Sequence, residues 1–233
     1  MHGIRILLLL LLSADLPAQD STTTRFLYFP HPMTERWHSS VGYTFTDLPR
    51  DVTEEVQLRA PVIDVHFLRR LARNAQLDIR VKSQILQNHL SAGPRFTKII
   101  NNRLSVSIGD DFAWWFGILM VSDFRTKANG FLNYPNASLG LKLRKNLLFT
   151  LKGEGLITLT ENYTVGRSNL ERAKASWDGY ALGLFLEQPF YKRMSVTLGF
   201  KAQYSNFFWQ TWPLFETFDR KIFYPEILVG FIR

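Results

Sequence analysis

Apolar and polar side chains alternate along much of this chain, most regularly between residues 194 and 205. Successive side chains of a β-strand point to opposite faces, so such a segment has one oily face and one polar face. The apolar set is Met194, Val196, Leu198, Phe200, Ala202 and Tyr204, and the set between them is Ser195, Thr197, Gly199, Lys201, Gln203 and Ser205. The pattern predicts a strand whose two faces meet different surroundings.

Four short polar turns, each with a basic residue, separate neighbouring alternating segments. They are Arg73-Asn74-Ala75, Asn101-Asn102-Arg103, Arg144-Lys145-Asn146 and Tyr191-Lys192-Arg193. Three links at the other end of these hairpins are longer and irregular, and they cover 119–133, 161–177 and 207–221. Tight turns at one end and long loops at the other are typical of a transmembrane β-barrel.

The same reading predicts an all-β, antiparallel, up-and-down barrel of about ten strands, with eight as the alternative. The expected strands are 37–47, 57–71, 76–87, 88–100, 103–118, 134–144, 147–160, 178–190, 194–205 and 222–232. Lys98 and Asp110 fall on the otherwise apolar faces of their strands. A lysine near the interface can extend its ammonium group to water, whereas Asp110 requires a bulge in its strand.

A closed barrel answers a specific problem of the membrane. Hydrocarbon offers no hydrogen-bond partner, so every backbone amide in it must be paired within the sheet. The predicted strands reach the 9–11 residues that cross a bilayer. A soluble β-sandwich or lipocalin-like barrel would show the same alternation with its oily face inward. The basic start followed by an apolar run, the unequal turn lengths and the last strand ending near Phe231 favour the membrane barrel.

The chain of 233 residues divides into three predicted parts. Residues 1–18 read as a signal peptide, with a basic start, an aliphatic run over 6–12 and a cleavage point near Ala18. Residues 19–36 are expected to be an irregular periplasmic lead-in, and residues 37–233 the barrel domain. Cysteine is absent, so no disulfide is expected.

The architecture resembles that of the small bacterial outer-membrane β-barrel proteins with eight to ten strands. The resemblance implies a porin-like integral protein of a Gram-negative outer membrane, in contact with membrane lipids and lipopolysaccharide and inserted by the barrel-assembly machinery. It departs from the pattern at Phe231-Ile232-Arg233, because such chains often end on the aromatic residue itself. A monomer is expected. The net charge of +8 is spread along strands and turns, which gives no indication of nucleic-acid binding.

Many charged residues fall on the predicted inner face of the barrel. This predicted lumen network comprises Asp64, His66, Asp78, Arg80, Lys82, Arg95, Asp111, Lys142, Lys152, Glu154, Glu187, Lys201 and Glu226. A narrow barrel fills its interior with side chains, and buried charges must pair. The expected role is therefore structural or surface interaction with a filled lumen. The alternative is a narrow ion or small-solute channel lined by residues such as Lys152 and Lys201.

Two short motifs resemble those of outer-membrane enzymes. His89 and Ser91 share one face of a strand, as in the lipid A deacylases, where a histidine activates a serine hydroxyl. Ala92 stands where that family has an asparagine, and no glutamate follows at a comparable distance. Asp64-Val65-His66 is similar to the Asp-x-His pair of the omptin proteases, but it lies in mid-strand. An enzyme is therefore the less favoured reading, with a lipid A hydrolase as the further alternative.

The aromatic loop 207–221 is the strongest candidate for a binding surface. Its candidate contact residues are Trp209, Trp212 and Phe215, unless the loop packs back onto the barrel rim. No metal site and no cofactor are expected, because cysteine is absent, the five histidines are scattered and no glycine-rich phosphate loop occurs.

Overall fold

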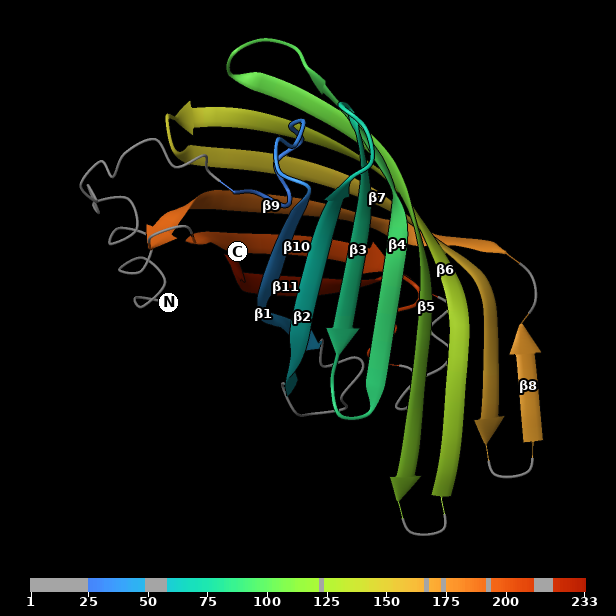
Figure 1. Cartoon of the computed structure of the whole chain (residues 1–233). Helices are drawn as coiled ribbons and strands as arrows, with labels where there is room; N and C mark the ends of the chain where they lie inside the picture. The colour runs from blue at the N-terminus through green and yellow to red at the C-terminus, as the bar shows by residue number, and fades with distance from the viewer. Residues whose placement is uncertain are drawn as a thin grey trace.

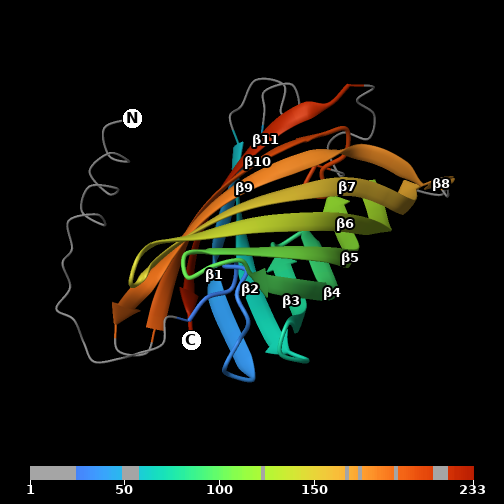
Figure 2. The same cartoon turned by 90° about the horizontal axis from the view of Figure 1, so that it is seen from above.

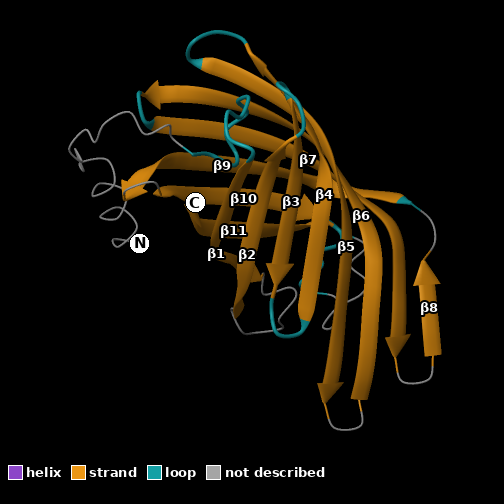
Figure 3. Ribbon diagram, viewed as in Figure 1, coloured by secondary structure: helices purple, strands orange, loops and turns teal. Residues whose placement is uncertain are grey.

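The structure is a computed structural model of the whole chain. It describes residues 25–48, 58–121, 124–165, 168–172, 175–191, 194–211 and 220–233. The described residues form strands, turns and irregular segments, without a helix (Figure 3). The predicted signal peptide over residues 1–18 lies outside the described part.

The described residues form eleven strands in one antiparallel sheet. They are β1 (Trp37–Leu48), β2 (Leu58–Arg70), β3 (Ala75–Ser83), β4 (Gln87–Ile99), β5 (Leu104–Val121), β6 (Phe124–Arg144), β7 (Leu147–Val165), β8 (Ser168–Arg172), β9 (Ser176–Tyr191), β10 (Met194–Ser205) and β11 (Ile222–Ile232). Each of the ten long strands pairs with its neighbours along the chain, and β1 pairs with β11 from Ser40↔Ile232 to Thr46↔Glu226. This last pairing closes a ten-stranded barrel (Figures 1 and 2), which confirms the predicted fold class.

Two of the predicted loops were wrong. Residues 119–133 belong largely to β5 and β6, which stay paired up to Val121↔Phe124. Residues 161–177 contain the end of β7, all of β8 and the start of β9, and β8 pairs with the end of β7. The backbone ladder between these strands continues beyond the length needed to cross a bilayer. As a result, β5–β8 overhang the barrel at the end opposite the basic turns (Figure 1).

The strand faces match a lipid-facing wall and a closed interior. Along β1 exposed and buried positions alternate, with Val41, Tyr43 and Phe45 exposed and the residues between them buried. Exposed aliphatic and aromatic side chains continue round the wall on other strands, for example Ile108, Leu139 and Phe231. No helix among the described residues is long and apolar enough to cross a bilayer.

Lys98 and Asp110 keep their predicted outward positions. Lys98 is exposed on the outer face of β4. The bulge expected at Asp110 is missing, since β5 pairs with β6 in an unbroken register from Leu104 to Val121. The Asp110 carboxylate instead accepts a hydrogen bond from the Asn133 side chain at 2.6 Å. The Asn133 side chain on the neighbouring strand β6 therefore gives the outward-facing carboxylate a polar partner, and the strand needs no bulge at Asp110.

The seam between β1 and β11 depends on Gly42. A Cβ atom at this position would lie 2.1 Å from the carbonyl oxygen of Val229, whereas a Cβ at Gly153 of β7 would meet nothing within 4 Å. We expect Gly42→Ala to lower the free energy of unfolding by about 2 kcal/mol, because the backbones must separate. Gly153→Ala, the matched control, should change it by less than about 0.5 kcal/mol. Urea unfolding in lipid–detergent micelles measures both, and equal midpoints would contradict a tight seam.

Candidate functional site

The lumen is filled at three successive levels. Residues 25–33 occupy the mouth at the end of the basic turns, and are named the plug. A layer of charged side chains follows in the middle of the barrel. An aromatic layer then closes the end beneath the overhang. Each level is held by different chemistry.

One buried carboxylate holds the backbone of the plug. Glu187 of β9 accepts hydrogen bonds from the backbone N–H groups of Leu27, Tyr28 and Phe29, at 2.7, 3.1 and 2.8 Å. The Arg95 guanidinium donates to the carbonyl oxygen of Leu27 at 2.6 Å. Backbone groups that are buried inside a barrel need such partners, because an unpaired buried N–H or C=O group is costly. Sequence-distant polar side chains thus replace the ladder that a strand would have supplied.

Apolar packing completes the plug. Leu27 and Phe29 are 0% and 1% exposed. The Tyr28 ring stacks on Phe185 of β9 with 3.8 Å between ring centres. The plug packs in one cluster with Leu68, Leu148, Leu228 and Ile232 of the wall. The lead-in is irregular in its described part, but residues 25–33 lie inside the barrel mouth. The run Phe26-Leu27-Tyr28-Phe29 was the available sequence signal for this.

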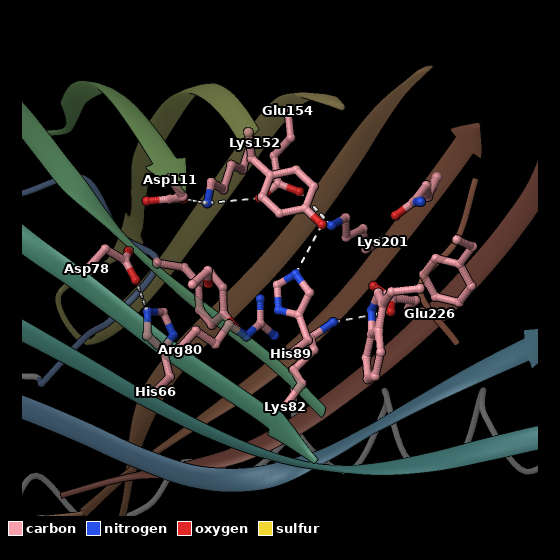
Figure 4. Close-up of a pocket in the computed structure, with 16 residues that line it drawn as sticks. His66, Asp78, Arg80, Lys82, His89, Asp111, Lys152, Glu154, Lys201 and Glu226 are labelled. Atoms are coloured by element: carbon pink, nitrogen blue, oxygen red, sulfur yellow. Dashed lines mark hydrogen bonds and ion pairs between the residues drawn. The ribbon is translucent and has the colours of Figure 1, made fainter. Parts of the chain in front are cut away.

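The middle layer pairs five cations with five carboxylates. Its described contacts are Arg80–Asp64 at 2.5 Å, Lys82–Glu226 at 3.2 Å, Lys201–Glu154 at 2.5 Å, Lys152–Glu154 at 2.9 Å, Lys152–Asp111 at 3.8 Å, Arg95–Asp78 at 3.5 Å and His66–Asp78 at 2.6 Å. These side chains come from β2–β5, β7, β10 and β11. Those labelled in Figure 4, such as Lys152, Glu154 and Lys201, point toward one another across the lumen. Their charges therefore balance within the layer.

A cavity of about 50 Å³ lies among these groups, between the Tyr28 ring of the plug and Trp209 of the aromatic layer. A space of this size is large enough for a few water molecules and far below the usual volume of a site for an organic ligand. Among the described residues, the Nδ1 atoms of His66 and His89 are buried without a protein partner. The cavity is thus a small polar space among the paired charges.

The aromatic layer is formed partly by the chain that links β10 to β11. Phe208 and Trp209 are 2% and 4% exposed. They pack in one cluster with Trp115, Tyr163 and Tyr224 of the wall. The Gln87 side chain donates to the carbonyl oxygen of Gln210 at 2.9 Å and ties this link to β4. Trp209 therefore packs into the lumen instead of presenting an outer surface, while Trp212 and Phe215 lie outside the described residues.

The barrel has an apolar wall that faces outward and paired charges that face inward. This distribution shows which medium surrounds the barrel. Only lipid favours that distribution, since water would favour the reverse. The chain is an outer-membrane β-barrel protein. This confirms the predicted class and location, and contact with membrane lipid follows from both.

No protein-family model matches the sequence, and no curated protein matches it. Solved structures with a similar fold include the attachment invasion locus protein Ail of Yersinia pestis, at 10% identity and a TM-score of 0.41, with 84% of this chain and 95% of that chain covered. Neisserial surface protein A has 10% identity, a TM-score of 0.42 and coverages of 85% and 96%. The translocator domain of the autotransporter NalP from Neisseria meningitidis has 9% identity, a TM-score of 0.42 and coverages of 86% and 88%.

The structure brings most of the predicted lumen network together, with two members placed elsewhere. Glu187 holds the plug instead of joining the middle layer. Lys142 lies near His31 in the mouth, and burial, with this ammonium group nearby, lowers the pKa of the His31 imidazole. His31 is therefore neutral at pH 7. The sequence reading missed Tyr134, whose hydroxyl lies 3.0 Å from His89 Nε2.

The two enzyme-like motifs are engaged in other contacts. His89 pairs with Tyr134, and its ring lies 5.4 Å from that of Trp209, whereas no hydrogen bond joins it to Ser91 among the described contacts. Both residues line the small internal cavity, away from lipid. Asp64 pairs with Arg80, and His66 with Asp78, so the Asp-x-His residues serve separate ion pairs. This arrangement gives no support to the hydrolase alternative.

Proposed function

We propose that the protein is a closed barrel that acts through its external end, as a surface-interaction protein, and does not conduct solutes in its resting state. The filling of the lumen carries this proposal. The plug, the paired charges and the aromatic layer fill the lumen around a polar cavity of about 50 Å³. The overhang of β5–β8 then offers a surface beyond the strand length that the membrane requires (Figure 1).

The overhang is large for a part that the membrane does not require. β5, β6 and β7 have 18, 21 and 19 residues, against the 9–11 that cross a bilayer. We propose that this wall lies among the sugars of lipopolysaccharide, where it meets its partner. The proposal includes a monomer that the barrel-assembly machinery inserts. Sedimentation in detergent, with the detergent density-matched, measures the oligomeric state, and a dimer mass would contradict the monomer.

A gated channel is the second candidate, favoured by the attachment of the plug. Residues 25–33 are not part of the wall and depend on Glu187 and Arg95 for their backbone contacts. A plug held in this way is removable without breaking the barrel ladder. The lumen behind it carries both signs of charge, as in a narrow ion pathway.

Single-channel recording in planar bilayers separates these two candidates. We expect the refolded protein to give no conductance steps, because all three levels are closed. A variant without residues 25–33 should also remain silent, since the paired charges and the aromatic layer remain. Reproducible steps from the full chain would contradict the closed barrel. Steps from the shortened variant alone would establish the gated channel. The heat-dependent gel shift of a folded barrel is the control for refolding.

A further inference from the structure

Exposed cations gather at the end of the barrel that carries the short turns. They are Arg36, Arg73, Lys98, Arg103, Arg144 and Lys145, and this set is named the basic collar. The collar runs from the start of β1 through the β2–β3 and β4–β5 turns to the β6–β7 turn. Short turns face the periplasm in outer-membrane barrels, so the collar lies at the periplasmic end.

The collar cations lack partners within the described protein. None of the six forms an ion pair with a described carboxylate, whereas each of the five cations of the middle layer contacts one. Glu35 is the acidic side chain in the described part of this rim, and it pairs with Arg25 at 3.1 Å. An uncompensated positive field therefore surrounds the periplasmic end.

The external end differs in its charge pattern. Asp47 and Arg59 lie directly opposite each other on β1 and β2. The exposed Lys127 lies on the overhanging part of β6. Both signs are thus mixed among the described residues there, so the excess positive charge is a property of one rim and not of the whole surface.

The depth of the collar places it at the level of lipid headgroups. Lys98 emerges from the outer wall between the exposed apolar side chains of Phe96, Ile100 and Ile108. Leu143 is 49% exposed directly before Arg144. Cations that border an apolar wall meet the phosphates of the surrounding lipids, because the wall itself sits in the acyl chains.

We propose that the basic collar binds the headgroups of anionic phospholipids in the periplasmic leaflet. Clusters of basic residues at a membrane surface attract anionic lipids, and an arginine guanidinium binds phosphate oxygens through two parallel hydrogen bonds. The collar is such a basic cluster and contains arginine guanidinium groups, while the adjoining apolar wall receives the acyl chains. A soluble anion would use the cations alone. This binding is independent of the function proposed for the external end.

Native mass spectrometry of the folded protein tests the proposal. Detergent micelles are doped with phosphatidylglycerol or phosphatidylcholine of identical acyl chains, and the lipid concentration at half-saturation is compared. We expect phosphatidylglycerol to bind at least about tenfold more tightly to the wild type, since each cation near an anionic surface contributes several-fold. Arg103→Gln/Arg144→Gln/Lys145→Gln should reduce that preference to less than about threefold.

The matched control is Arg59→Gln/Lys127→Gln/Lys221→Gln, which removes the same charge from the external end and should keep the preference. No preference in the wild type, or the same loss in this control, would overturn the proposal. Displacement of the lipid by equimolar inorganic phosphate would also overturn it, because it identifies a soluble anion site. If the collar triple variant does not refold, Lys98→Gln is expected to weaken the preference by itself, and an unchanged preference would count against the proposal.

Discussion

Glu187→Ala is expected to release residues 25–33 from the barrel mouth. The substitution removes the acceptor of three backbone N–H groups, at Leu27, Tyr28 and Phe29. Each buried donor without a partner costs about 1–3 kcal/mol. The three donors together would cost about 3–9 kcal/mol if the plug stayed in the mouth. The plug can avoid that cost by leaving, so the loss in the free energy of unfolding cannot exceed the free energy of plug docking.

Proteolysis and urea unfolding both report whether the plug has left the barrel mouth. Thermolysin should cut the variant within Phe26–Phe29, which is buried in the wild type, and the urea midpoint in lipid–detergent micelles should fall. Glu35→Gln is the matched control. It also removes a carboxylate that contacts the lead-in, but this residue is part-exposed and its pair with Arg25 contributes less than about 1 kcal/mol. A variant of Glu187 that resists thermolysin as the wild type does would show that apolar packing alone holds the plug.

Arg80→Met is expected to destabilise the barrel by about 3–5 kcal/mol, because it leaves the Asp64 carboxylate buried without its cation. Asp64 is 3% exposed, and its contact with Arg80 is 2.5 Å. Its other described partner is the Thr44 hydroxyl at 2.7 Å, which does not neutralise the charge. The measurement is again the urea midpoint in lipid–detergent micelles.

The double variant Arg80→Met/Asp64→Asn should recover most of that loss. It removes both charges, and the oxygen of the introduced amide still accepts the hydrogen bond from the Thr44 hydroxyl. The double-mutant cycle then gives a large coupling energy for the pair. Lys127→Met, at an exposed external position, should change the midpoint little. Additive losses in the double variant would contradict direct pairing and would make the two residues independent contributors.

The sequence predicted the strands well because their evidence is local. The last strand was expected at 222–232, and β11 has those bounds. The expected turns around Arg73, Arg103 and Arg144 all lie between paired strands. The overhang was missed for a different reason. Residues 119–133 have weak alternation, and their strand structure depends on pairing between β5, β6 and β7.

The sequence also predicted which charged residues face inward, but it did not predict which of them form ion pairs with each other. Period-two alternation predicted that Asp64, Arg80 and Glu226 point inward, and all three do. Which carboxylate meets which cation depends on the register of neighbouring strands and on closure at β1–β11. Lys82 and Glu226, for example, are separated by 144 positions in the chain. No local pattern contains that information.

The sequence by itself determined that the chain forms strands with one apolar and one polar face, about ten of them, with charges collected on the inner side. These features depend on side-chain direction, which repeats every two residues in any strand. The tertiary structure alone decided how the described residues fill the lumen. Residues 25–33 have no strand pattern, and their position depends on the distant Glu187 carboxylate and on the width of the closed barrel. The filling of the lumen is a long-range property because its donors, acceptors and packing surfaces come from opposite ends of the chain.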